Sequence, residues 1–132
     1  MKNEAKILVQ EFLSAVQAGN FERVGTLLHP EVIWEQPGNN RFSGKKKSLE
    51  EVFQMVGGMF ELSGKTLALT EVKNIMVNGD MVSCLLRWQA ANPFGGRLDV
   101  DNIDVYTVRD GKITEAKVFS ADPAQEDRFW GE

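Results

Sequence analysis

The sequence predicts an α+β domain in which three helices come first and a curved, mixed but mainly antiparallel sheet packs around them. Before Gly64, apolar residues recur at helical spacing, and after Gly64 apolar and polar residues alternate in four stretches separated by turns. Helices that precede consecutive strands are typical of α+β domains, whereas βαβ proteins alternate the two. A chain of 132 residues fits one domain, so we expect a single domain over residues 1–132.

The first two helices are predicted by their apolar spacing and by the residues at their ends. Residues 3–18 form an amphipathic helix, and Gly19 is the glycine that commonly follows one. A second helix is expected from Phe21 to about Leu28. It should stop before Pro30, because the residue before a proline disfavours the helical conformation.

A short strand and a third helix complete the first half. Residues 32–36 alternate as a strand. Ser48 is followed three residues later by Glu51, which is the capping-box pattern, so a third helix is expected from there to about Leu62. The pair Gly57-Gly58 should weaken or kink that helix.

The second half is predicted to consist of strands. Turn signals at Asn78-Gly79-Asp80 and Asp110-Gly111, and a longer turn over residues 92–96, separate the alternating stretches. The expected strands cover residues 66–77, 81–91, 97–109 and 112–120. Because the connections are short, neighbouring strands should pair antiparallel.

The composition limits the partners and the compartment. A formal charge of −4 argues against binding to nucleic acid or to an anionic membrane. The single cysteine, Cys84, cannot form an internal disulfide, which fits a reducing compartment. The first 12 residues lack the uninterrupted apolar run of a signal peptide or a membrane span, so we expect a cytoplasmic protein.

Two stretches carry a family resemblance. The first joins residues 9–12 and 18–20 to the strand and Pro-Gly pair of residues 32–38, and the second is the hairpin of residues 103–113. In this order they resemble the NTF2-like superfamily, in its ketosteroid-isomerase and SnoaL-like branch, and the resemblance covers nearly the whole chain. It implies a cone in which a curved mixed sheet wraps around the helices and leaves a deep, mostly apolar pocket. It also implies a homodimer through the outer face of the sheet.

Ketosteroid isomerases move a proton with a carboxylate at the end of the first strand. A tyrosine on the first helix and a protonated aspartic acid on a late strand hold the oxyanion. Aligned to them, this sequence has Phe12 at the tyrosine and Gln36 at the carboxylate, and only Asp104 matches. Phenylalanine donates no hydrogen bond and a neutral amide takes no proton, which argues against steroid isomerisation by the usual route. Glu35 could replace the base only if its strand slipped by one residue. The resemblance leaves a polar pocket with one acid, and it implies an aspartate of the kind on which SnoaL-like cyclases rely.

Strand alternation supports a pocket position for Asp104. Along residues 97–109, it shares a face with Asn102, Tyr106 and three apolar residues. Burying an unpaired carboxylate is costly and raises its pKa. Two hypotheses stay open: Asp104 is a pocket acid or base, or it is a structural acid satisfied by Asn102, Gln36 or a backbone amide.

The same periodicities predict the rest of the pocket wall. Small residues opposite large aromatic ones would leave a cavity, although plain core packing explains each aromatic residue equally well. The expected substrate-binding residues, beside Asp104 as the catalytic one, are Phe12, Val16, Trp34, Gln36, Phe53, Phe60, Trp88, Asn102 and Val118.

No metal or organic cofactor is expected. Asp99 and Asp101 suggest a metal cluster with Asp104, but alternation sends Asp104 to the opposite face. His29 is the only histidine and is expected at a solvated helix end. The run Lys45-Lys46-Lys47 is expected to be a solvated loop.

Three functions from different classes stay open. The chain is a SnoaL-like isomerase, cyclase or lyase acting through Asp104, a protein that binds an apolar ring-containing metabolite without turnover, or a dimer whose purpose is protein association. The polar groups expected at the pocket floor favour the first two functions, and the missing base favours the second over the first. We expect a small-molecule ligand, and neither nucleic acid nor a membrane as a partner.

Overall fold

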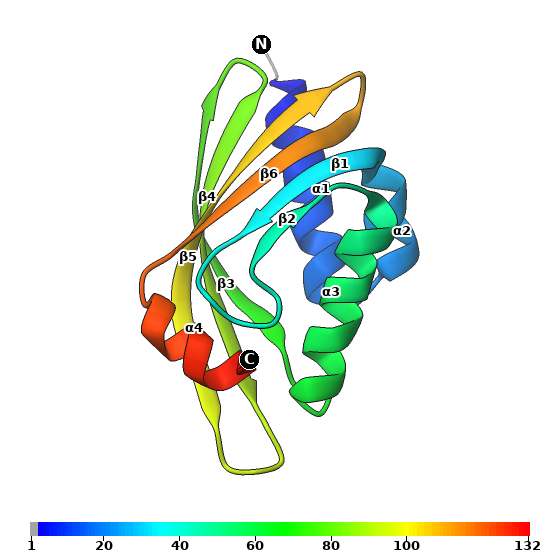
Figure 1. Ribbon diagram of the computed structural model, residues 1–132. Coiled ribbons are helices and arrows are strands. Elements are labelled where there is room, and N and C mark those ends of the chain that lie inside the picture. Colours follow the sequence, from blue (N-terminus) through cyan, green and yellow to red (C-terminus); the bar gives the residue numbers. More distant parts are fainter. Residues whose placement is uncertain (1–2) are drawn as a thin grey trace.

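The computed structural model describes residues 3–132. A six-stranded sheet in the order β2-β1-β6-β5-β4-β3 curves around three helices, and a fourth helix lies at one end of the sheet (Figure 1). Neighbouring strands are antiparallel except β1 and β6, which are parallel. The predicted α+β fold with a curved, mixed and mainly antiparallel sheet is confirmed. The elements are α1 (Glu4–Ala18), α2 (Phe21–Leu27), β1 (Leu28–Gln36), β2 (Gly44–Lys46), α3 (Leu49–Leu62), β3 (Ala68–Asn78), β4 (Met81–Ala91), β5 (Arg97–Arg109), β6 (Lys112–Ser120) and α4 (Pro123–Trp130).

Helix α1 ends as predicted, and helix α3 begins as predicted. Gly19 ends α1 in the left-handed conformation, with φ 68°. The Ser48 hydroxyl accepts a hydrogen bond from the backbone N–H of Glu51 at the start of α3. Helix α3 continues through the glycine pair, and the weakening or kinking of the helix there stays a prediction. A Cβ on Gly58 would lie 2.7 Å from the Phe42 ring, so this glycine allows close packing.

Strand β1 begins earlier than predicted. Leu28 already pairs with Ile113 of β6, so His29 and Pro30 lie within the strand and not at a helix end. The register between β1 and β6 shifts between Leu28 and Ile33. Such an irregularity accommodates the proline, which has no N–H to give to a ladder.

Two elements lie outside the predictions. Strand β2 pairs with β1, so most of the three-lysine segment is a short edge strand and not a loop. Helix α4 follows the last strand: the Asp122 side chain accepts a hydrogen bond from the backbone N–H of Gln125, and Pro123 occupies its first position. Asp followed by Pro is a recognised helix start.

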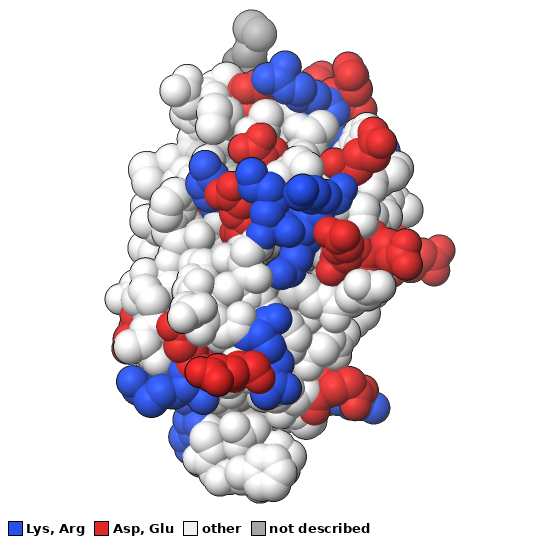
Figure 2. Space-filling view, viewed as in Figure 1, with Lys and Arg blue, Asp and Glu red and all other residues white. Residues whose placement is uncertain are grey.

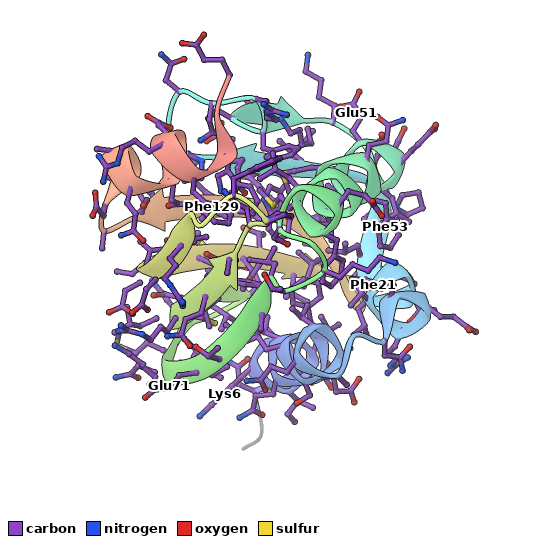
Figure 3. All side chains as sticks on the ribbon, turned by 90° about the horizontal axis from the view of Figure 1, so that it is seen from below. Lys6, Phe21, Glu51, Phe53, Glu71 and Phe129 are labelled. Carbon is purple, nitrogen blue, oxygen red and sulfur yellow. The ribbon has the colours of Figure 1, made fainter. Side chains whose placement is uncertain are left out.

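The core lies between the helices and the concave face of the sheet, where side chains fill the space (Figure 3). Viewed from below, α3 and α4 lie on opposite sides of this packed interior. On β5, Asn102, Asp104 and Tyr106 are buried together with the apolar residues at the other even positions, as alternation predicts.

The surface carries charges of both signs. On the face in Figure 2, groups of basic and acidic side chains are interspersed and separated by broad uncharged areas. None of the helices in residues 3–132 is both long and apolar enough to span a membrane.

Candidate functional site

A cavity of about 120 Å³ lies between the helices and the inner face of the sheet. Helices α1, α2 and α3 supply one wall, the strands supply the other, and α4 contributes Glu126 and Trp130. Most of its lining is apolar. An engineered apolar cavity of roughly 150 Å³ holds benzene, so this space fits about one six-membered ring.

All ten predicted site residues line this one cavity. Phe12 and Val16 come from α1, Phe53 and Phe60 from α3, and the other six from the sheet. Their parts in ligand binding and catalysis stay predictions.

Asp104 lines the cavity and is buried, 2% exposed. The Tyr106 hydroxyl donates a hydrogen bond of 2.7 Å to its Oδ2 atom, and its Oδ1 atom has no partner among the described residues. Among the described residues, neither Asn102 nor Gln36 donates a hydrogen bond to Asp104, although strand alternation had made both of them possible partners. Because Oδ2 accepts the Tyr106 proton, a proton on the carboxyl would sit on Oδ1.

Burial controls the charge of this pair. It raises the pKa of Asp104 from 3.8 to about 7, the Tyr106 hydrogen bond opposes the shift, and the nearby Glu126 carboxyl adds to it. Burial, reinforced by Asp104, also raises the pKa of Tyr106 well above 10.0, so the phenol stays protonated and donates. Cys84 lies opposite Asp104 on β4, and burial raises its thiol pKa to about 12, which makes it an inert packing residue.

The two departures from the isomerase pattern are visible in the geometry. Gln36 lines the cavity, and its Oε1 atom accepts a hydrogen bond of 3.0 Å from the indole N–H of Trp34. Phe12 packs edge-on against the Tyr106 ring, with centroids 5.5 Å apart. The phenol that Phe12 lacks is present on β5, where Tyr106 donates to Asp104.

Three polar side chains at the site escaped the sequence prediction. Tyr106 shares a strand face with Asp104 two residues away, and that spacing could have identified it. Glu126 and Trp130 lie on α4, 4% and 2% exposed, and both line the cavity. Their role was hidden because α4 itself was not predicted.

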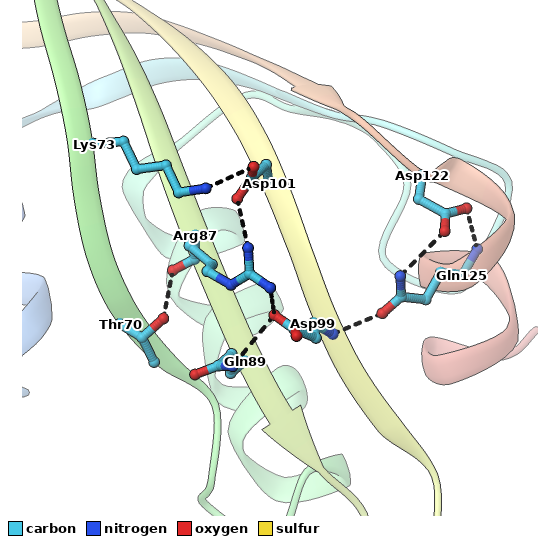
Figure 4. A network of polar contacts seen from close by, with 8 residues as sticks. All are labelled: Thr70, Lys73, Arg87, Gln89, Asp99, Asp101, Asp122 and Gln125. Carbon is cyan, nitrogen blue, oxygen red and sulfur yellow. Dashed lines mark hydrogen bonds and ion pairs between the residues drawn. The ribbon is translucent and has the colours of Figure 1, made fainter.

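The remaining candidates lie outside the site. Asp99 and Asp101 face the outer surface, where they pair with Arg87 and Lys73 (Figure 4). Glu35 forms ion pairs with two lysines, does not line the cavity and cannot supply the missing base there. No group of three or more potential metal ligands occurs within residues 3–132.

Comparison with known proteins agrees with the fold. A family model described as a SnoaL-like domain matches residues 9–116. An uncharacterized Mycobacterium tuberculosis protein is 27% identical over 124 residues, which cover 93% of each chain. A Xanthomonas campestris protein of unknown function with a cystatin-like fold is 36% identical, with a TM-score of 0.92 and coverage of 97% of this chain and 98% of that one. TerC, co-crystallized with polyporic acid, is 17% identical, with a TM-score of 0.83 over 97% of this chain and 99% of that one.

The buried Asp104 should make folding stability fall as pH rises. Below about pH 4, folded and unfolded chains both hold its proton. Between its ordinary pKa of 3.8 and its folded pKa of about 7, only the folded chain keeps the proton, so stability is lost progressively and the loss is complete above the folded value. The difference is about three pKa units, at ~1.36 kcal/mol each, or roughly 4 kcal/mol.

Urea unfolding of the wild type and of Asp104→Asn at several pH values measures this loss. Relative to Asp104→Asn, the wild type should lose about 4 kcal/mol of unfolding free energy between acidic and mildly alkaline pH. The exposed Glu115→Gln variant, on β6, should follow the wild type. A difference between wild type and Asp104→Asn that stays constant, or that grows in favour of the wild type, would show that Asp104 is a structural acid.

Proposed function

We propose that this chain, which belongs to the SnoaL-like domain family, binds a small ring compound carrying a carbonyl and holds the carbonyl oxygen with Asp104. The supporting observation is the Oδ1 atom of Asp104, which has no partner among the described residues and belongs to the lining of a mostly apolar cavity. Buried polar atoms in folded proteins nearly always have a partner, so a ligand or water must supply one here. The co-crystallisation of TerC with polyporic acid agrees with a ligand-binding role for this fold.

The electrostatics select the kind of oxygen that is bound. No lysine or arginine among residues 3–132 lines the cavity, so a buried carboxylate ligand would meet no cation. A neutral Asp104 donates from Oδ1 to a carbonyl oxygen. Negative charge that develops on that oxygen strengthens the hydrogen bond, as it does in an oxyanion hole.

The chemistry consistent with this arrangement is proton transfer next to a carbonyl, as in an isomerase or cyclase of SnoaL-like type. Asp104, with a pKa of about 7, is suited to give or take a proton near neutral pH. Binding without turnover is the second candidate, because Gln36 takes no proton and Phe12 donates none. Enolisation of a bound ketone separates the two candidates.

We also propose that the chain forms a homodimer through the outer face of the sheet. Ile103 of β5 and Phe119 of β6 are cross-strand neighbours there, 44% and 51% exposed, with Val105 beside them. Exposed apolar neighbours on a sheet face favour an isologous contact. The unpaired Cys84 suits a reducing compartment such as the cytoplasm.

One prediction of the binding proposal concerns carbonyl recognition. Acetophenone and α-methylstyrene have nearly the same shape, but only acetophenone offers a carbonyl oxygen. The ratio of their dissociation constants, measured by titration calorimetry or NMR, should shift against the ketone by about tenfold in Asp104→Leu, because one hydrogen bond is lost. Asp104→Asn should keep much of the ketone affinity, since an amide also donates.

The pH dependence of binding supplies the control for this prediction. Ketone affinity in the wild type should fall as pH rises through about 7, because ionised Asp104 no longer donates, while α-methylstyrene affinity should change little. A ratio that does not respond to either the substitution or the pH would contradict carbonyl recognition by Asp104.

A second prediction concerns steroids. A 3-keto-Δ5-steroid has four rings, whereas the cavity of about 120 Å³ accommodates about one, so the wild type should isomerise it little above background. Gln36→Asp combined with Phe12→Tyr should raise turnover only if the pocket admits the steroid. The ultraviolet absorbance of the conjugated enone measures this turnover. Substantial turnover by the wild type would show that the cavity walls move and that another base is present.

The third prediction concerns assembly. Light scattering at micromolar concentration should return a dimer mass for the wild type. Phe119→Lys should return a monomer mass. In an isologous contact the two substituted lysines are buried in the same interface, where their like charges repel each other. Phe94→Lys, a change at a turn residue that is 94% exposed, should leave the dimer intact. A monomeric wild type would contradict the proposed interface.

A further inference from the structure

The cavity contains a second buried acid. Glu126 of α4 is 4% exposed and lines the same space as Asp104. Of the five buried side-chain atoms without a partner in residues 3–132, four belong to cavity residues: Asn102 Oδ1, Asp104 Oδ1, Glu126 Oε2 and Trp130 Nε1. Unpaired polar atoms gathered in one mostly apolar cavity indicate a ligand that carries polar groups of its own.

The position of Glu126 is fixed by contacts on both sides of it. Its neighbour Gln125 accepts a hydrogen bond of 2.6 Å from the backbone N–H of Asp99 on β5 (Figure 4). Its other neighbour, Asp127, accepts from the backbone N–H of Asn39 and from the Asn40 amide, each at 2.8 Å. Helix α4 is therefore tied to the sheet and to the loop after β1, and it holds Glu126 in the cavity wall.

The two acids have different surroundings. Burial raises the pKa of Glu126, the nearby Ser120 and Trp130 side chains oppose the shift, and the charges of Asp127 and Asp122 add to it. The charge of Glu126 in turn raises the pKa of Asp104. Two acids that disfavour each other's ionisation lose their protons in separate steps, so a state with one neutral and one ionised acid is populated.

We propose that Glu126 is the proton acceptor of this pocket, in the role that Gln36 cannot fill, and that Asp104 is the matching proton donor. Apart from these two, the ionisable side chains that line the cavity within residues 3–132 are limited to the Tyr106 phenol, which donates to Asp104. A carboxylate and a neutral acid in one pocket are the pair that enolisation of a ketone needs. The proposal rests on ketone binding at Asp104.

The step is a balanced proton transfer. A C–H bond next to the bound carbonyl breaks, and its proton goes to Glu126 Oε2. The electron pair of that bond forms a carbon–carbon double bond, and the carbonyl π pair takes the proton of Asp104 Oδ1, which gives an enol. In a β,γ-unsaturated ketone the enol is a conjugated dienol, so return of the proton from Glu126 to the γ carbon, with the enol proton returning to Asp104, shifts the carbon–carbon double bond and restores the Glu126 carboxylate and the neutral Asp104.

Exchange of the acetophenone methyl protons for deuterium, followed by proton NMR in D₂O near neutral pH, tests the step. With the wild type, the exchange rate should exceed the rate in buffer alone, and it should saturate as the acetophenone concentration rises. Glu126→Gln should lose about 10²–10⁴-fold of that acceleration while keeping the acetophenone affinity, because a general base is worth that much and the amide preserves shape. Asp104→Asn should also lose the acceleration, Glu126→Asp should retain part of it, and Glu115→Gln should match the wild type.

The outcomes separate this proposal from the binding proposal. If Glu126→Gln exchanges the methyl protons at the wild-type rate while Asp104→Asn exchanges them slowly, the role of Glu126 is overturned and that of Asp104 stands. No saturable binding of acetophenone would overturn both, and binding with exchange equal to buffer would overturn the proton transfer alone. Should Glu126→Gln fail to fold, carboxyl-carbon NMR of the wild type decides: Glu126 should lose its proton at a lower pH than Asp104, and the reverse order would overturn the assignment of acceptor and donor.

Discussion

The register of β5 between β4 and β6 is the constraint on which the pocket depends. Because β5 is hydrogen-bonded along both edges, a side chain cannot change faces unless both ladders slip by one residue. Asp104 lies opposite Cys84 on one side and Val118 on the other, so its carboxyl must face the helices. The outward ion pairs of Asp99 and Asp101 favour the same register, since a slip would bury them among apolar residues.

Burying the Asp104 carboxyl in this register lowers the stability of the fold. A carboxyl whose folded pKa is about 7 lowers the unfolding free energy at neutral pH by several kcal/mol, against a typical total of about 5–15 kcal/mol. The Tyr106 hydrogen bond recovers part of this cost but leaves one oxygen atom of the carboxyl unpaired. A purely structural acid would be surrounded by donors to both oxygen atoms. The arrangement at Asp104 is instead the one expected where binding, and not stability, determines the residue.

The sequence was sufficient for the features that follow from short-range periodicity. Strand alternation placed Asp104, Trp88 and Val118 on the inner face, and the bounds of β4, β5 and β6 match the predicted spans. It was insufficient for β2, which is three residues long, and for the residues after β6, where the Asp122-Pro123 helix start was overlooked. Cavity volume also depends on how α3 packs across the sheet, which no local pattern determines.

The location of the second acid shows why a site can be only half visible in a sequence. Glu126 reaches the cavity because α4 is anchored to a loop that lies more than 80 residues earlier, through contacts such as Asn39 to Asp127 with a separation of 88. A general base must lie within reach of a particular C–H bond, but the chemistry does not specify which element carries it. A glutamine at the end of β1 therefore removes one location for the base without removing the function, provided that another element brings a carboxylate to the same space. In this fold the helix after the last strand is such an element, because it contributes Glu126 and Trp130 to the cavity lining.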